Sequence, residues 1–544
     1  MNVFKFIKVN CLAILAVTIM TGNAHAAIHN AGRVMAIGDF DGDGRDDLAV
    51  GFPYDSPPSS HGSFEGGGVR IYFSTTATDQ MPGGTPLDLY HPDFGETGGR
   101  FGASLSTGDY NNDGITDLAV GMPNKTVSGK SQAGIVYIYL GDTNHGFLSL
   151  YNNVLRPGLT ETVQDDPDSS TIYTVVGSPR TNDHFGKVLA SGDFDCDGAD
   201  DLAVGVPEYD LNTGETLIAS AGAVWALYGQ KFHGVTPRSQ IFMQGVGGIT
   251  GDTKASDQFG FTLATGKFNS DCFEDLAVGV PFEDITVSGS AKTNAGLVNV
   301  LYGGDYFSSS PMGTKNEAWY ESKSSSLVSV SDTNERFGYA LAVGNFDGNS
   351  NDDLAIGVPG QSIGGHENAG AVHIIYSGSS GLAIAGDQRF HQNSGDIDGG
   401  AELNDSFGAA LAAGRFNSGD TVDDLAIGVP YEDFGDDPSG DDIGVVHILF
   451  GVQDNGLTDV GPQYIHQNRS GVAGSNETHD HFGETLVTGN FNLGSGFTDI
   501  AIGAPGASGA PSTAAGKINL MRGSGAAPNA LQTSNDQQLL PHYP

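Results

Sequence analysis

A single pattern recurs seven times along the chain and restricts the fold more than any other feature. Each copy has a Gly-[Asp/Asn/Lys/Arg]-[Phe/Tyr] turn, a polar loop, and the run Asp-[Leu/Ile]-Ala-[Val/Ile]-Gly-x-Pro. Six copies follow a Phe-Gly pair, and successive pairs lie 70 to 84 residues apart. Such self-similarity indicates one structural unit copied along the chain. The apolar runs are residues 47–53, 117–123, 201–207, 275–281, 353–359, 424–430 and 499–505.

The third repeat illustrates what one unit contains. Alternating apolar residues predict a strand at 187–194, and the fully apolar run 202–206 predicts a second strand buried on both faces. Residues 222–229 and 240–243 predict a third strand and a short outer fourth. One such unit cannot bury both of its faces, but seven arranged radially can. The sequence therefore predicts an all-β fold, a seven-bladed β-propeller of four-stranded antiparallel blades.

The propeller accounts for nearly the whole chain. Residues 1–26 have the charged start, short apolar core and Ala-His-Ala cleavage site of a signal peptide. We expect the propeller over 27–524, with a tail at 525–544 that is either disordered or completes the last blade. Because the first repeat lacks a Phe-Gly pair, closure of the ring could use residues near the N-terminus.

Charge and hydropathy narrow the class of partner and the location. A net charge of -41 argues against nucleic acid and anionic lipid as partners. No later stretch approaches the roughly 20 apolar residues of a membrane helix, so we expect no membrane insertion. These features predict a monomer that is secreted, periplasmic or held at the cell surface after cleavage of the signal peptide.

Three repeats carry an acidic loop between their first and second strands, with side-chain oxygens at loop positions 1, 3, 5 and 9. Calcium accepts about six to eight oxygens, and a Gly after position 5 allows the sharp turn. A solvated turn is the alternative, but carboxylates this close would repel by ~1–4 kcal/mol per pair without a cation. The loops predict three Ca²⁺ sites, with a backbone carbonyl at position 7. The predicted ligands are Asp39, Asp41, Asp43, Arg45 and Asp47; Asp109, Asn111, Asp113, Ile115 and Asp117; and Asp193, Asp195, Asp197, Ala199 and Asp201.

The other four loops match less well. Repeat five keeps oxygen at all four positions but has Ser350 in place of the Gly, so it is a fourth candidate site. Its predicted ligands are Asn345, Asp347, Asn349 and Asp353. Repeats four, six and seven have Lys267, Arg415 and Asn490 at position 1, and we expect them to bind no cation.

Two cysteines fall in these loops, Cys196 in repeat three and Cys272 in repeat four. In an exported protein a disulfide between neighbouring blades is plausible if their Cα atoms approach within about 7 Å. Two free thiols are the alternative.

The Phe-Gly pairs, the Asp-x-Asp-x-Asp-Gly-x-x-Asp loops and the Leu-Ala-Val-Gly-x-Pro runs together resemble the FG-GAP repeats of the integrin alpha-chain N-terminal propeller. The resemblance covers nearly all of residues 30–523. It implies a seven-bladed propeller with calcium in the acidic loops of one face and partner contacts in cell adhesion on the other. Because the chain has no integrin stalk or membrane helix, it is more similar to a bacterial-type secreted propeller.

The leading hypothesis is an extracellular calcium-binding recognition or cell-adhesion propeller. It would be non-enzymatic and would bind an extracellular protein or glycan through the loops opposite the calcium loops. A carbohydrate-binding propeller is the alternative, and a polysaccharide- or ester-processing enzyme comes third. A lectin would need exposed aromatic residues, and the candidates are Tyr54, Phe64, Tyr209, Phe282, Tyr431 and Phe434.

Three further patterns are candidate sites. The acidic stretch within 431–444 could meet a basic partner or share a cation, or it could be solvated; its acids are Glu432, Asp433, Asp436, Asp437, Asp441 and Asp442. Residues 360–364 fit a nucleophile-elbow pattern but lie between antiparallel strands, where that motif does not function. His479 and His481 could pair on a metal, although the repeat places them in the loop that leads into a blade.

Overall fold

The computed structural model describes the chain from residue 33 to residue 539 with gaps, and all of its regular structure is β. The predicted signal peptide at 1–26 lies outside the described residues. No helix among the described residues has the length and apolarity needed to cross a membrane. The described residues are 33–54, 66–74, 81, 85–91, 98–143, 146–147, 153–166, 169–305, 311–323, 331–417, 421–433, 441–491, 496–509, 513–514, 516–526 and 529–539.

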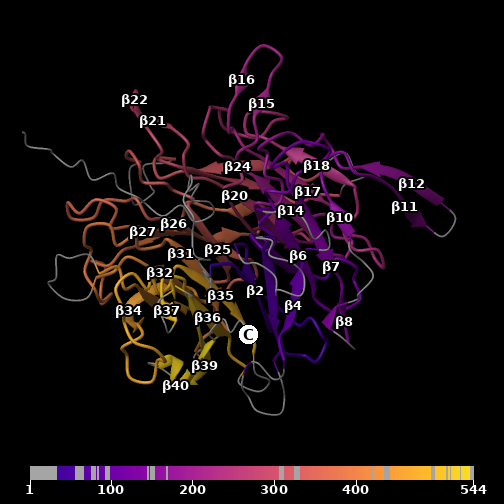
Figure 1. The fold of residues 1–544 in the computed structure, drawn as a ribbon. Helices are drawn as coiled ribbons and strands as arrows, with labels where there is room; N and C mark the ends of the chain where they lie inside the picture. The colour runs from indigo at the N-terminus through magenta and orange to yellow at the C-terminus, as the bar shows by residue number, and fades with distance from the viewer. Residues whose placement is uncertain are drawn as a thin grey trace, which may run out of the picture.

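Seven four-stranded antiparallel sheets confirm the predicted seven-bladed propeller. Figure 1 shows the blades following one another in chain order, with the yellow last blade beside the indigo first blade. The first three blades are β1 Met35–Gly38, β2 Asp47–Phe52, β3 Gly68–Tyr72 and β4 Leu87–Tyr90; β5 Ser104–Gly108, β6 Asp117–Met122, β7 Ile135–Tyr139 and β10 Asn153–Leu155; and β13 Val188–Gly192, β14 Asp201–Val206, β17 Ala223–Leu227 and β18 Ser239–Phe242.

The remaining four blades have the same order of strands from the first to the outer fourth. They are β19 Thr262–Gly266, β20 Asp275–Val280, β23 Leu297–Leu301 and β24 Asn316–Trp319; β25 Ala340–Gly344, β26 Asp353–Val358, β27 Ala371–Ile375 and β30 Gln388–Phe390; β31 Ala410–Gly414, β32 Asp424–Val429, β33 Val445–Val452 and β34 Gly456–Ile465; and β35 Thr485–Gly489, β36 Asp499–Ala504, β39 Lys517–Ala526 and β40 Asn529–Leu539.

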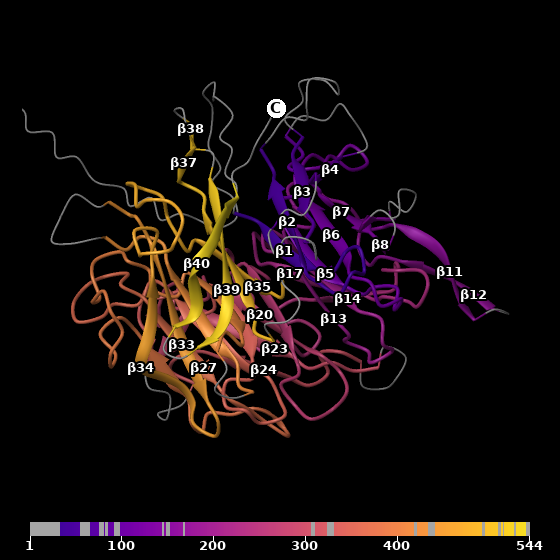
Figure 2. The same ribbon diagram turned by 90° about the horizontal axis from the view of Figure 1, so that it is seen from below.

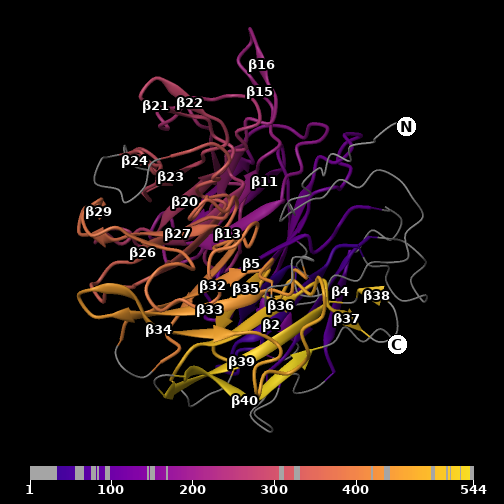
Figure 3. The same cartoon turned by 90° about the vertical axis from the view of Figure 1, so that its left-hand side faces the viewer.

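Two-stranded hairpins decorate the blades. The longest, β11 with β12, extends away from the ring in Figures 1 and 2, and β15 with β16 projects in Figures 1 and 3. Their bounds are β8 Gly141–Asp142, β9 Gly146–Phe147, β11 Thr160–Asp166, β12 Ser169–Thr174, β15 Leu211–Asn212, β16 Leu217–Ile218, β21 Ile285–Val287, β22 Ser290–Lys292, β28 Ser377–Gly378, β29 Gly381–Leu382, β37 Ser508–Gly509 and β38 Thr513–Ala514.

The second strand of every blade is buried along its whole length, as its apolar run predicts. Each blade face packs against a neighbouring blade, so a strand in the middle of a sheet has no solvent side. The Gly in these second strands lets the backbone of the next blade approach closely. At Gly205 of β14, an added Cβ would lie 2.4 Å from the carbonyl oxygen of Gly260 in the next blade.

The Phe-Gly pairs join blades two to seven to the preceding blade. In blades two to six, the Phe of the pair forms a parallel bridge to the Gly just before the third strand of the preceding blade, as Phe259 does with Gly222. Gly222 has φ +88°, and an added Cβ would lie 2.2 Å from the Phe259 nitrogen, so no side chain fits there. The Phe side chains are buried, so each of them packs in the interface between two blades.

Backbone hydrogen bonds connect all seven blades at the other end of their first strands. The residue before the conserved Asp of each second strand donates its N–H to the carbonyl at loop position 1 of the preceding blade, over 2.8–3.0 Å. The donor–acceptor pairs are Thr116–Asp39, Asp200–Asp109, Glu274–Asp193, Asp352–Lys267, Asp423–Asn345, Thr498–Arg415 and Asp46–Asn490. The last pair closes the ring between blades one and seven with the same bond as every other junction.

Blade seven is built entirely from C-terminal residues, and β40 is its outer strand. Of the two alternatives for the tail, the structure therefore places residues 529–539 in the last blade. No strand is shared between blades one and seven in the described part of the chain. Their contact is a hydrophobic cluster that includes Met35, Val50, Ile518 and Leu539.

Candidate functional site

The ring has two faces with different chemistry. First strands run from the Phe-Gly pairs to the acidic loops, so the two features lie at opposite ends of the blades. We call these ends the Phe-Gly face, which carries residues 101–102 and their counterparts, and the acidic-loop face, which carries residues 39–47 and their counterparts.

The acidic loop ends in the same Asp in all seven blades, at position 9 in blades one to five and at position 10 in blades six and seven, and each of these residues has no exposed surface. In blade one, the two carboxylate oxygens of Asp47 accept the N–H groups of Phe40 at 3.1 Å and Ser74 at 2.8 Å. Asp117 accepts those of Tyr110 at 3.0 Å and Gly141 at 2.8 Å. This Asp therefore ties the loop to the third strand even in blades that lack the other acids.

The loops of blades one and three bring three carboxylates together. Asp39, Asp41 and Asp43 each have an oxygen within 4.8 Å of the others, and so do the acids at positions 1, 3 and 5 of loop three, Asp193, Asp195 and Asp197. Backbone N–H groups hold this shape, since Asp39 accepts bonds from Asp43 at 2.9 Å and Gly44 at 2.8 Å. The loops therefore gather oxygen ligands of the kind a hard divalent cation takes.

Loop two has the same backbone arrangement with an Asn at position 3. Asp109 accepts the N–H groups of Asp113 at 3.0 Å and Gly114 at 2.8 Å, as Asp39 does in loop one. Asn111 is buried, and its side-chain Oδ1 has no hydrogen-bond partner among the described residues. The Oδ1 of Asp195, at position 3 of loop three, is also buried without a partner. Buried oxygens are rarely left unpaired, so both loops fit a bound cation.

Burial of these carboxylates changes their protonation. Burial is the main cause that raises the pKa of Asp47 to about 8, with the charge of Asp41 adding to it. Burial likewise raises the pKa of Asp117 to about 8 and that of Asp195 to about 7. Taking a carboxylate out of water disfavours its charged form, and a nearby positive charge favours that form again. In loop three, Arg238 already supplies such a charge, since its Nη2 lies 3.0 Å from Asp195 Oδ2.

In two of the loops expected to bind no cation, a side-chain amide donates a hydrogen bond to the buried Asp. In blade four, the side-chain amide of Asn269 at position 3 donates to Asp275 at 3.3 Å. In blade six, the amide of Asn417 donates to both oxygens of Asp424, at 3.0 and 3.1 Å. In these two blades an amide from the loop itself donates to the buried Asp at the end of the loop.

Loop five lies between these two cases. The amide of Asn345 donates to the carbonyl of Asn349, and the amide of Asn349 donates to Asp347 at 3.1 Å. Its side-chain oxygens accept bonds from the loop as well, since Gly348 donates to Asn345 at 2.8 Å. Internal amides thus satisfy much of this loop, which makes it the weakest of the four candidate sites.

A disulfide joins the acidic loops of blades three and four. Cys196 and Cys272 are bonded, with a Cα–Cα distance of 5.8 Å. Of the two alternatives left open by the sequence, the structure has the disulfide and not two free thiols. It connects a loop with a complete set of acids to a neighbouring loop that has Lys267 at position 1.

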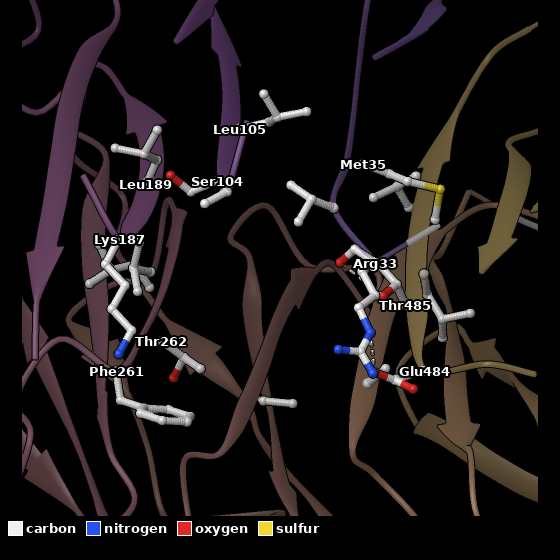
Figure 4. Close-up of a pocket in the computed structure, with 18 of the residues that line it drawn as sticks. Arg33, Met35, Ser104, Leu105, Lys187, Leu189, Phe261, Thr262, Glu484 and Thr485 are labelled. Atoms are coloured by element: carbon white, nitrogen blue, oxygen red, sulfur yellow. Dashed lines mark hydrogen bonds and ion pairs between the residues drawn. The ribbon is translucent and has the colours of Figure 1, made fainter. Parts of the chain in front are cut away.

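On the Phe-Gly face, the ends of the first strands surround a cavity of about 360 Å³. Its polar lining includes Arg33, Arg100, Lys187 and Glu484, and Figure 4 shows Arg33 pointing to Glu484 with Lys187 across the cavity. Arg33 Nε lies 3.4 Å from Glu484 Oε1. No pattern in the sequence indicates these residues, because they come from different blades and share no motif.

Two interpretations of the Phe-Gly face change with the structure. Glu432 is not a solvated acid, because it is buried and hydrogen-bonded to Gln392, and burial raises its pKa to about 9. Phe282 packs edge-on against Phe261, with ring centroids 5.3 Å apart, so it serves loop packing. Tyr54 is 37% exposed and remains a candidate contact residue. Phe64, Phe434, Asp436 and Asp437 lie outside the described residues.

Comparison with known proteins identifies the repeats. Residues 31–72, 101–139, 185–227 and 337–375 match the FG-GAP repeat family. The chain is 30% identical over 227 residues to phosphatidylinositol-glycan-specific phospholipase D of Bos taurus, covering 41% of this chain and 23% of that protein. It is 26% identical over 273 residues to integrin alpha-PS2 of Drosophila melanogaster, covering 48% and 16%. The chain thus matches less than a quarter of the length of either relative.

One solved structure, an exotype rhamnogalacturonan lyase, aligns with 88% of this chain and 70% of its own length at a TM-score of 0.38 and 13% identity. This likeness carries no argument about fold or function.

Proposed function

We propose that this chain, an FG-GAP repeat protein whose propeller is related to integrin alpha chains, is an extracellular calcium-binding recognition protein without catalytic activity. It would bind a protein or glycan through its Phe-Gly face, in a role such as cell adhesion, while calcium orders the opposite face. The observation that carries the calcium assignment is the convergence of acids in loops one and three, together with unpaired buried oxygens at position 3 of loops two and three.

The division between the faces supports a recognition role. The acidic-loop face has short loops of nine or ten residues between first and second strands, whereas the loops on the Phe-Gly face differ more in length and sequence between blades. Loops carried on a rigid scaffold are where binding residues commonly lie. The cavity at this face adds convergent polar groups, Arg100 and Lys187 among them, to a mostly apolar wall.

The disulfide supports an extracellular location, because such bonds persist in oxidising compartments. A purely structural role for calcium is expected from the position of the loops, far from the Phe-Gly face. Among the described residues that line the cavity, Glu484 is the single carboxylate and Arg33 pairs with it, which supports binding there rather than acid–base catalysis.

Calcium binding can be tested by titrating the chelator-treated protein in a calorimeter. We expect three sites, and a higher melting temperature with Ca²⁺ because a ligand that binds only the folded state stabilises it, by about 2.7 kcal/mol per site at 100 times Kd. Asp43→Asn should remove one site. Its matched control is Asp271→Asn, at position 5 of loop four, which should leave the number of sites unchanged. No heat of binding on addition of Ca²⁺, together with the same melting temperature in Ca²⁺ and in chelator, would overturn the assignment.

Partner recognition is tested separately, by arraying the calcium-loaded protein against extracellular matrix proteins and polysaccharides. A protein ligand would support the adhesion role, and a selective glycan ligand would move the proposal to a lectin. Arg100→Ala should weaken binding by at least tenfold if the cavity contributes. Removal of charge at Lys125, outside the cavity lining on the same face, serves as the control. Unchanged binding with Arg100→Ala would place the partner elsewhere on the ring.

A further inference from the structure

We propose a second metal site, for a first-row transition ion such as Zn²⁺, formed by Asp442, His479 and His481 on the Phe-Gly face between blades six and seven. These three residues each offer one ligand atom, and the atoms lie within 4.8 Å of one another. Imidazole nitrogens with one carboxylate suit Zn²⁺ and its neighbours, whereas calcium prefers oxygen alone. The site is thus chemically distinct from the acidic loops and independent of the proposal for them.

The ligand spacing fits a tetrahedral ion. Zn–N and Zn–O bonds of roughly 2.0–2.2 Å place neighbouring ligand atoms about 3.3 Å apart. The Nδ1 of His479 lies 3.2 Å from Asp442 Oδ2, and the rings of His479 and His481 have centroids 6.2 Å apart. Three protein ligands leave the fourth position for water or a donor atom from a binding partner. The side chain of His479 is 61% exposed, so that position is open to solvent.

A buried carboxylate stands behind one of the imidazoles. His481 Nδ1 lies 3.2 Å from Glu484 Oε2, and the Glu484 side chain is only 3% exposed. The other oxygen of Glu484 faces Arg33 at 3.4 Å. A carboxylate that accepts the Nδ1–H of a histidine fixes its tautomer and leaves Nε2 as the free ligand, an arrangement typical of metal sites.

The repeat supplies an internal comparison. The loop before each Phe-Gly pair runs beside the loop before the third strand of the preceding blade, through the same backbone bonds: His481 donates to the Asp442 carbonyl at 3.3 Å, and Ser406 donates to that of Asn368 at 2.9 Å. Between blades five and six, the residues at the positions of Asp442 and His479 are Asn368 and Asn404, which share an amide hydrogen bond of 2.9 Å.

The junction between blades four and five has the same neutral pair, Asn294 with Asn334, also at 2.9 Å. A hydrogen-bonded pair of Asn side chains is therefore enough to maintain this junction between blades. The carboxylate and two imidazoles at the last junction add metal-binding atoms to a geometry that is stable without them. They also adjoin the central cavity, since Glu484 lines it.

The test uses the full protein without a polyhistidine tag, kept in excess Ca²⁺ so that the acidic loops do not compete. Titration with ZnCl₂ in a calorimeter should give one site in the wild type. The variant Asp442→Asn with His479→Asn installs the Asn pair of the preceding junction, and its Zn²⁺ affinity should fall at least 100-fold while its melting temperature without Zn²⁺ stays unchanged. Glu484→Gln should weaken Zn²⁺ binding by about 10- to 100-fold.

Co²⁺ provides a second readout that does not depend on stability. Tetrahedral Co²⁺ absorbs visible light more strongly than octahedral Co²⁺, so the wild type should develop this absorption and the Asn variant should not. The converse variant, Asn368→Asp with Asn404→His and Ser406→His, should create an additional site. Equal Zn²⁺ affinity in the wild type and the Asn variant, or no Zn²⁺ binding by the wild type, would overturn the proposal.

Discussion

At the scale of single residues, the repeated Asp of the second strand shows how one position serves every blade. Its carboxylate caps the N–H groups of two segments in each of the seven blades, including those with an incomplete acidic loop. The repetition of this Asp in the sequence is therefore explained by folding alone. Evidence for a cation comes instead from positions 1, 3 and 5, which vary between repeats.

His447 of β33 makes stability depend on pH. It is buried between the rings of Phe407 and Tyr464, neither ring nitrogen has a hydrogen-bond partner among the described residues, and burial lowers its pKa to about 3. The unfolded chain binds a proton below about pH 6.5 and the folded chain does not, so stability falls as pH drops.

We therefore expect this histidine to cost about 2 kcal/mol of stability between pH 7 and pH 5. The variant His447→Asn takes the residue found at the corresponding positions Asn299 and Asn519. Urea unfolding of both proteins at pH 7 and pH 5 should show their stability difference shifting by that amount in favour of the variant. A difference that is constant with pH would contradict the prediction.

Gly205 tests how closely the blades approach. An added Cβ would meet the Gly260 carbonyl at 2.4 Å, which is backbone and cannot swing aside. Gly205→Ala should therefore cost about 1–3 kcal/mol through overpacking. Gly378→Ala, where an added Cβ meets nothing within 4 Å, should change stability by less than about 0.5 kcal/mol. Equal unfolding midpoints for the two variants would show that the blades can separate to admit a methyl group.

At the scale of elements, the disulfide between two loops is the one covalent cross-link between blades, besides the backbone itself, in the described part of the chain. It closes a segment of 76 residues. The variant Cys196→Ser with Cys272→Ser should lose about 2–5 kcal/mol of unfolding free energy, because the unfolded chain gains freedom. Denaturant unfolding measures this loss, and the oxidised wild type treated with a reductant should reproduce it. An unchanged midpoint in both experiments would argue against a stabilising bond.

At the scale of the whole molecule, the junction between blades one and seven matches the others. Asp46 accepts the N–H of Asn490 through Oδ2 at 2.6 Å, and Asp352 accepts that of Lys267 at 2.8 Å within the ring. Because both junctions are built alike, Asp46→Ala and Asp352→Ala should destabilise equally, by about 1–3 kcal/mol. Thermal unfolding of the two variants compares them directly. A much smaller effect at Asp46 would mean that the ring opens at this junction.

The acidic loops and the strands of each blade were predictable from sequence because both depend on residues close together in the chain. Alternation of apolar residues, the run before each Pro and the spacing of the acids all act within one repeat. The pairing of Cys196 with Cys272 was also within reach, since repeat register aligns the two loops. The location of Glu432 was not, because its burial depends on Gln392 of another blade.

The sequence by itself determined the number of blades, the strands within each blade and the loops that gather oxygen atoms, since local hydrogen bonds and apolar patterns specify them. Only the tertiary structure decided how the ring closes, which carboxylates lose their water, and which side chains meet across a blade junction. The pair of Arg33 with Glu484 exists because circular closure brings the first and last repeats together. The cluster of Asp442, His479 and His481 forms because the loops of two neighbouring blades pack side by side.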